Sequence, residues 1–443
     1  MKKVLSLLFV VAVTHLYAQQ KPKLVVGIVI DQMKTEYLYR FQNDFSENGF
    51  KRLMKDGFTF YNMHYNYMPT YTAPGHASIY TGTTPALHGI VSNEWFHRTL
   101  KKEVYCTDDD SVTTLVPGTE KEGKMSPKNL QATTITDELK LATNFKGKVI
   151  GMSIKDRGAI LPAGHFADWA FWYTKTGEFI SSSFYGKTLP NWVTEFNQEK
   201  QYLPYINSGW NLLKPVETYN ESLADNNNYE GKLYKKLPVF PYNLKEMYDS
   251  NDAGVLRVTP FGNDVLANLA KRAIEKEALG KDDVTDFLAV SFSSTDYIGH
   301  TFGPRSIEIQ DTYLRLDLTI ADFLNYLDKE GFQYGVAGKD YMANGYSYHD
   351  DKTGFVKVEA EVIYTGTTSM HIAINVFSRN IKRQEFEKKT HCIIVFVAVD
   401  DEGNSVHVPK FTPETEHEKQ MEQYAIKLMD LRKNIEDEMK PFF

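Results

Sequence analysis

Lys23-Leu24-Val25-Val26-Gly27-Ile28-Val29-Ile30 is a mostly β-branched run that stops abruptly at Asp31. A continuous apolar run of this length is typical of a strand that is buried on both faces of a sheet. Two later runs, at residues 148–154 and 286–292, have the same form. These three runs predict a sheet whose strands are mostly parallel.

Charged or metal-ligating residues follow each of the three predicted strands. Asp31 follows the first, Lys155 and Arg157 follow the second, and Asp296 and His300 follow the third. The carboxyl ends of parallel strands meet at one edge of a sheet, so we expect these side chains to share a site there.

Helical patterns separate the strands, and the clearest lies after His300. Its apolar residues recur at alternating spacings of four and three and predict one buried helix face: Ile309, Tyr313, Leu316, Ile320, Phe323 and Leu327. The fold class is therefore α/β, with helices on both faces of the sheet. Residues 163–260 hold four of the five tryptophans and several prolines, and we interpret them as an inserted cap over the site.

A second informative stretch is Tyr67-Met68-Pro69-Thr70-Tyr71-Thr72-Ala73-Pro74-Gly75-His76-Ala77-Ser78. Pro74, two residues past Thr72, predicts a helix start with Thr72 at the N-cap. The unpaired N–H groups of a helix start would favour a phosphate ester on the Thr72 hydroxyl. The alternative interpretation is a threonine that only caps the helix.

The residues at the predicted sheet edge suit phosphoryl chemistry with two zinc ions. Asp296 and His300, four apart, are a good zinc-ligand pair, and Asp31 could bind a second ion that also contacts Thr72. Each also has a structural interpretation, since Asp31 could cap the next helix and Asp296 could simply hydrogen-bond with His300.

Two cations and one amide are candidates for phosphate binding. Lys155 and Arg157 would face the same way on an extended segment, and two positive charges suit the dianion of a phosphate monoester. Asn93 could add a neutral donor to a phosphoryl oxygen. The alternatives are solvated surface charges and a turn asparagine.

Composition and the N-terminus limit the partners. The 443-residue chain has 50 basic and 57 acidic residues, a net charge of −7 without long blocks, which predicts no general attraction to nucleic acid or anionic membranes. Residues 1–18 have the basic, apolar and small-residue regions of a signal peptide, which predicts a periplasmic or secreted protein with no membrane attachment after cleavage. Cys106 and Cys392 leave a disulfide possible. The oligomeric state is not assigned.

The character of the chain changes after Gly331. Residues 333–354 are rich in Gly and Tyr and are predicted to be a junction. Alternating strands, a third buried strand at residues 392–399 and an amphipathic helix at residues 413–440 follow, which predicts a small antiparallel α+β unit over residues 355–443.

Residues 19–332 resemble the alkaline phosphatase superfamily, and closely resemble its secreted bacterial phosphomonoesterases with a threonine nucleophile. The matching motifs are Val29-Ile30-Asp31-Gln32-Met33, Pro69-Thr70-Tyr71-Thr72-Ala73-Pro74-Gly75-His76, Ser92-Asn93-Glu94-Trp95, Ile154-Lys155-Asp156-Arg157 and Ser294-Thr295-Asp296-Tyr297-Ile298-Gly299-His300. The resemblance implies that Thr72 is phosphorylated and that Asn93, Lys155 and Arg157 bind phosphate. It also implies one zinc ion on Asp31 and Thr72 and another on Asp296 and His300.

The sequence departs from that family after residue 332. The family's Asp-His-Gly motif and a later histidine complete the two zinc sites, and neither is found; His349-Asp350 has the residues in reverse order. Each ion would keep two protein ligands. Residues 355–443 instead resemble the C-terminal half of a hotdog-fold acyl-CoA thioesterase, which leads to the hypothesis of a chimera of two incomplete genes.

The sequence thus predicts an exported enzyme that hydrolyses small phosphate monoesters through a phosphothreonine intermediate with two zinc ions. Two alternatives stay open. One is a phosphodiesterase or nucleotide pyrophosphatase of the same superfamily, and the other is a catalytically inactive chimera.

Overall fold

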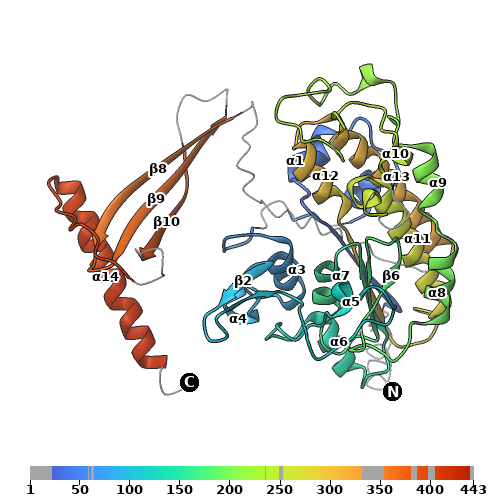
Figure 1. The fold of residues 1–443 in the computed structure, drawn as a ribbon, viewed down its shortest axis with the longest axis horizontal. Coiled ribbons are helices and arrows are strands. Elements are labelled where there is room, and N and C mark those ends of the chain that lie inside the picture. Colours follow the sequence, from blue (N-terminus) through green and yellow to red (C-terminus); the bar gives the residue numbers. More distant parts are fainter. Residues whose placement is uncertain are drawn as a thin grey trace, which may run out of the picture. The chain divides into compact units, whose positions relative to one another are not determined.

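The computed structural model describes residues 22–57, 59–60, 64–234, 236–248, 253–331, 354–380, 387–397 and 405–439. The chain divides into two compact units, Met1–Tyr346 and Ser347–Phe443, with their boundary inside the segment predicted to be a junction (Figure 1). The predicted signal peptide and His349-Asp350 lie outside the described residues.

A five-stranded sheet forms the centre of the first unit, in the order β1-β7-β4-β5-β6. All neighbours are parallel except β5 and β6, which are antiparallel. The strands are β1 (Leu24–Ile30), β4 (Val149–Ser153), β5 (Trp169–Tyr173), β6 (Phe179–Ile180) and β7 (Asp286–Phe292). The predicted parallel sheet is confirmed.

The burial of the strands follows their place in the sheet. Every residue of β4 and β7 is buried, as predicted. β1 also packs on both faces, as predicted, with Val26, Ile28 and Ile30 against the main core and Val29 in a separate core. Most of its residues are only partly buried, because β1 is the edge strand of the described sheet.

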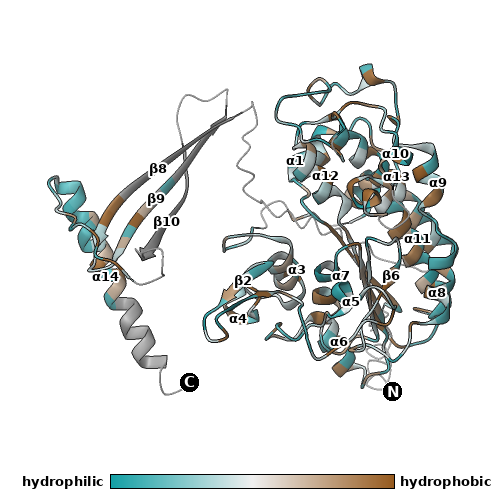
Figure 2. Cartoon of the chain, in the orientation of Figure 1, coloured by the Kyte–Doolittle hydropathy of each residue, from teal (hydrophilic) through white to brown (hydrophobic). Residues whose placement is uncertain are grey.

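Helices cover both faces of the sheet (Figure 1). Along β5, Phe171 and Tyr173 join the hydrophobic core that includes α11, whereas Ala170 and Trp172 pack with α7 on the opposite face. The strands of this sheet are largely hydrophobic (Figure 2). The longer helices are α3 (Thr72–Thr81), α6 (Ile135–Ala142), α7 (Asp156–Ala163), α8 (Asn191–Gln198), α11 (Phe261–Lys276), α12 (Ser294–Phe302) and α13 (Ile307–Lys329).

Shorter elements complete the first unit. A two-stranded antiparallel ribbon pairs β2 with β3. These elements are α1 (Thr35–Arg40), α2 (Phe50–Asp56), α4 (Pro85–His88), β2 (Glu94–His97), β3 (Lys102–Tyr105), α5 (Glu120–Gly123), α9 (Leu203–Ser208), η1 (Val216–Thr218), α10 (Leu244–Met247) and η2 (Gly254–Val258). Among the described residues, no helix combines the length and hydropathy that crossing a bilayer requires.

The helix predicted after His300 is α13, and its six predicted core residues are all buried. The predicted cap at residues 163–260 needs a correction at its start. Residues 169–173 form β5 and pair with β4 inside the central sheet, because their apolar side chains fill the core on both faces.

The second unit contains a three-stranded antiparallel sheet in the order β10-β9-β8, with α14 packed on β8. Among the described side chains of this unit, Ile363, Ala373 and Ala425 form a buried cluster, and the described start of α14 is largely hydrophilic (Figure 2). The elements are β8 (Gly354–Thr365), β9 (Ser369–Asn380), β10 (Glu387–Val397) and α14 (Glu416–Met439). This confirms the predicted antiparallel sheet and helix. Cys106, in the first unit, is buried and is a free cysteine among the described residues.

Gly151 sets how closely α7 approaches β4. A Cβ atom there would lie 2.3 Å from the backbone oxygen of Ala159. We expect Gly151→Ala to lower the free energy of unfolding by about 1–3 kcal/mol, because the backbone of α7 would have to move. Denaturant unfolding measures the change.

Gly75 in α3 provides the matched control. A Cβ there meets only the Tyr65 hydroxyl, at 3.6 Å. Gly75→Ala should leave stability unchanged or raise it by about 0.5–1 kcal/mol, since alanine is the better helix residue. Equal losses in the two variants would contradict the assignment of close α7–β4 packing.

Candidate active site

A buried lysine joins the ends of three strands. Lys155 precedes α7, just after β4, and its Nζ atom lies 2.6 Å from Asp31 Oδ2 and 2.5 Å from Asp296 Oδ2. Burial would lower the pKa of the Lys155 ammonium, but the two carboxylates raise it above its ordinary value. The group is therefore charged and holds β1, β4 and β7 together at their carboxyl ends, as the sequence predicted for this edge.

Thr72 reaches the same cluster from α3. Its hydroxyl donates to Asp31 Oδ2 at 3.1 Å, and Lys155 Nζ donates to Thr72 Oγ1 at 3.5 Å. The predicted N-cap position was wrong by one residue: Tyr71 is the N-cap, and Thr72 opens the helix. The Tyr71 side chain makes no capping bond, and the Thr72 hydroxyl donates to Asp31 at the positive end of the helix.

Asp296 and His300 both lie on α12, four residues apart, with His300 Nε2 3.3 Å from Asp296 Oδ1. Burial would raise the pKa of Asp296, but the His300 hydrogen bond and the Lys155 charge lower it below its ordinary range. The hydrogen bond to Asp296 raises the pKa of His300. Asp296 contacts Lys155 through Oδ2 and His300 through Oδ1.

Arg157 faces a different neighbour from Lys155. The prediction that both share one face of an extended segment was wrong, because Lys155 is the extended N-cap and Arg157 lies in the first turn of α7. Arg157 Nη1 donates to the Tyr105 hydroxyl at 2.8 Å, while its Nε atom is buried and has no partner among the described residues. That unpaired donor makes Arg157 suited to an anionic ligand.

Asn93 lies beside the start of α3. Its Oδ1 atom accepts from the Ala73 N–H at 2.9 Å, and its NH₂ group makes no hydrogen bond within the described chain. Asn93 thus contacts the residue next to Thr72 and keeps a donor available.

Several positioning residues were not singled out from the sequence. His76 bridges α3 and β7, with Nδ1 2.8 Å from Thr72 O and Nε2 2.7 Å from Ser291 Oγ. Burial lowers the pKa of His76. Thr295 donates to Asp31 O at 2.6 Å, and Gln32 donates to Asp296 Oδ1 at 3.2 Å. The i,i+4 spacing of Thr72 and His76 on one helix was the available signal.

The cluster contains donors of the kinds that zinc uses but does not form a complete two-zinc centre. Asp31, Thr72, Asp296 and His300 give two side-chain ligands for each ion at most, and Lys155 lies between the two carboxylates. Among the described residues, three acidic, cysteine or histidine side chains lie close enough to share one ion at Asp225, Glu230 and Glu308, which are outside this cluster. The residues present therefore do not fit a full pair of zinc ions.

Residues 25–337 match the model of the family described as type I phosphodiesterase / nucleotide pyrophosphatase. The chain belongs to this family, and its resemblance to the alkaline phosphatase superfamily is confirmed.

Individual relatives match the same part of the chain. A Myroides odoratus protein named calcium-transporting ATPase is 55% identical over 314 residues, 70% of this chain and 57% of that protein. Alkaline phosphatase PafA of Elizabethkingia meningoseptica is 50% identical, over 71% of this chain and 58% of its own length. A crystal structure of PafA superposes with a TM-score of 0.69, covering 70% of this chain and 60% of the other. The chain therefore spans less than two thirds of these relatives.

A different relative accounts for a smaller part of the chain. A Bacillus subtilis protein described as an uncharacterised acyl-CoA thioester hydrolase, YkhA, is 34% identical over 79 residues, 18% of this chain and 46% of that protein. The resemblance to acyl-CoA thioesterases is thus confirmed as partial.

The Asp296–His300 pair predicts a titration that can be measured without turnover. In chelator-treated protein, NMR should give His300 a pKa above 6.5, and Asp296→Asn should lower it, because the carboxylate partner is lost. A His300 pKa at or below 6.5, or one unchanged by Asp296→Asn, would contradict this pairing.

The same pair sets a pH window. The raised His300 pKa contributes stability that is lost as pH rises above about 6.5, and the lowered Asp296 pKa contributes stability that is lost as pH falls below about 3.8. The pair should stabilise the fold most between these values.

Proposed function

We propose that the chain hydrolyses phosphate monoesters, with the Thr72 hydroxyl as nucleophile. One observation carries the proposal. Thr72 is the first residue of α3, and its hydroxyl donates to the Asp31 carboxylate at 3.1 Å and lies beside the Lys155 ammonium. An exposed surface threonine has neither a base nor a neighbouring buried cation.

A solved variant of a relative supports the choice of residues. That PafA structure carries substitutions at a threonine, an asparagine, a lysine and an arginine, spaced 21, 62 and 2 residues apart. Thr72, Asn93, Lys155 and Arg157 have the same order and the same spacings. The names of the alkaline phosphatase relatives support the monoesterase class.

The residues present suggest the following steps. The Thr72 oxygen attacks phosphorus while its proton passes to Asp31 Oδ2, the acceptor of its hydrogen bond. The bond between phosphorus and the ester oxygen breaks, and the alcohol leaves with a proton from solvent. Water then attacks phosphothreonine, and the bond between phosphorus and the Thr72 oxygen breaks. The proton held by Asp31 returns to the Thr72 oxygen, and inorganic phosphate leaves with the protons of the water, one of which it can release to solvent.

Charged and neutral donors would hold the phosphoryl group. The unpaired Nε of Arg157 and the Asn93 NH₂ are the donors that the described residues offer. Lys155 Nζ already contacts the Asp31 and Asp296 carboxylates. It can bind phosphate as well only when one of these carboxylates binds another cation in its place.

Zinc on Asp31, Thr72, Asp296 and His300 remains part of the proposal. When bound, zinc lowers the pKa of a coordinated hydroxyl and polarises phosphoryl oxygens. The steps above use only the side chains of this chain, because those four ligands do not complete two sites.

Thr72→Ala tests the nucleophile. We expect kcat/KM for an aryl phosphate to fall about 1,000-fold or more, because the attacking oxygen is lost. Thr72→Ser, which keeps a hydroxyl, is the matched control and should retain far more activity. Equal activity in wild type and Thr72→Ala would overturn the proposal, and an inactive wild-type chain would favour the inactive-chimera alternative.

The alternative class is a phosphodiesterase, which the family description supports. A monoesterase should prefer an aryl phosphate to a bis-aryl phosphate by about tenfold or more in kcat/KM, because its cations match a dianion. Arg157→Ala should reduce that preference. A preference for the diester would establish the alternative.

We also propose that the substrate is a small phosphate ester met outside the cytoplasm, because the N-terminal sequence has the form of a signal peptide. No nucleic-acid partner is proposed.

A further inference from the structure

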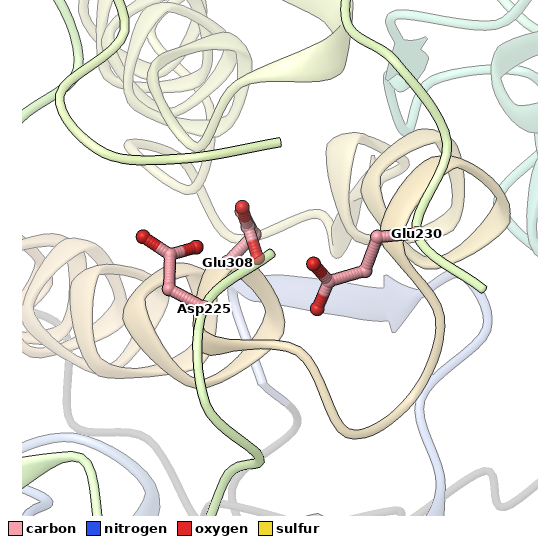
Figure 3. A group of neighbouring side chains, drawn as sticks. All are labelled: Asp225, Glu230 and Glu308. Carbon is pink, nitrogen blue, oxygen red and sulfur yellow. The ribbon is translucent and has the colours of Figure 1, made fainter. Parts of the chain in front are cut away.

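Three carboxylates meet away from the candidate active site. Asp225 and Glu230 belong to the loop between η1 and α10, and Glu308 lies in the first turn of α13. One oxygen from each side chain lies within 4.8 Å of the others, and the three carboxylates face one another (Figure 3).

Each carboxylate has one oxygen anchored and one unpaired. Asp225 Oδ2 accepts from Phe240 N at 3.1 Å, Glu230 Oε2 accepts from Asn227 N at 2.8 Å, and Glu308 Oε1 accepts from the Tyr242 hydroxyl. The second oxygens, Asp225 Oδ1, Glu230 Oε1 and Glu308 Oε2, are buried without a hydrogen-bond partner in the described chain. Anchored carboxylates with one unpaired oxygen each are pre-oriented ligands.

Burial makes it energetically costly to leave these carboxylates charged and without a partner. Glu308 is 0% exposed and Glu230 is 9% exposed. Burial raises the pKa of Glu308 to about 8, although the Tyr242 hydrogen bond lowers it, and the other two carboxylates raise it further. None of the three carboxylates forms a salt bridge with a lysine or arginine of the described residues. Buried negative charges of this kind require a compensating cation or a bound proton.

We propose that Asp225, Glu230 and Glu308 bind a calcium ion. The three ligand groups are carboxylates, and hard oxygen donors in an irregular loop suit Ca²⁺ better than zinc, which favours histidine and cysteine. Backbone carbonyls and water complete such a site in proteins.

The position of the site gives the ion a structural role. Leu223 N donates to Arg305 O at 2.9 Å and Gly231 N donates to Thr301 O at 2.6 Å, so the same loop already contacts the corner between α12 and α13. The ion would fasten this loop to the corner that follows Asp296 and His300 along the chain. This inference is independent of the proposed phosphatase activity.

Calorimetric titration of the chelator-treated full-length chain with CaCl₂ tests the site. Wild type should bind Ca²⁺, and Glu308→Gln and Glu230→Gln should weaken binding about tenfold or more, because each removes a charged ligand. If Glu308→Gln does not fold, Glu230→Gln still tests the site, because Glu230 lies in a loop.

Two controls separate this site from other carboxylates. Glu246→Gln removes an exposed carboxylate that pairs with Lys236 in the same region, and Asp296→Asn removes one from the candidate active site. Both should bind Ca²⁺ as wild type does. The proposal is overturned if wild type does not bind Ca²⁺, if both Glu308→Gln and Glu230→Gln bind as tightly as wild type, or if binding is lost in Asp296→Asn.

Tb³⁺, a luminescent substitute for Ca²⁺, gives a local readout. The Tyr242 hydroxyl donates to Glu308, and the Tyr242 ring stacks on Trp210 with their centroids 5.3 Å apart. Ultraviolet excitation should therefore sensitise Tb³⁺ emission in wild type and in Glu246→Gln, and added Ca²⁺ should quench it. Equal emission from Glu308→Gln would place the ion elsewhere and contradict the proposal.

Discussion

The salt bridges of Lys155 with Asp31 and Asp296 are the constraint on which the first unit depends. The lysine side chain is 1% exposed, and its two carboxylate partners follow β1 and β7. A buried charge is tolerated only when it is paired, so the three strand ends must meet in one register. Thr72 donates to the same Asp31 oxygen and accepts from Lys155, so the salt bridge and the candidate chemistry use the same atoms.

Close packing behind the strand ends fixes where those atoms lie. Gly151 lets the backbone of α7 approach β4, which places Lys155 and Arg157 at the sheet edge. His76 ties the start of α3 to Ser291 of β7 and so positions Thr72. The site residues thus lie on helices or directly beside the ends of helices and strands, which favours a precise geometry.

Apolar periodicity was sufficient to predict β4, β7 and α13, because each is buried along its predicted face. It could not show that β1 is an edge strand, since strand order is set by distant contacts. The cluster at Asp31, Thr72, Lys155 and Asp296 followed from parallel topology, whereas the Arg157–Tyr105 contact depends on where α7 begins. The three carboxylates of Asp225, Glu230 and Glu308 come together only in the tertiary fold, and no local sequence motif predicts their grouping.

If Thr72 is the nucleophile, it carries the phosphoryl group during turnover. The most direct measurement is acid quenching of the enzyme during hydrolysis of a labelled aryl phosphate, followed by peptide mapping. We expect the label on Thr72, in the peptide that contains the start of α3. Label on another residue, or turnover with no labelled protein under any quenching time, would contradict it.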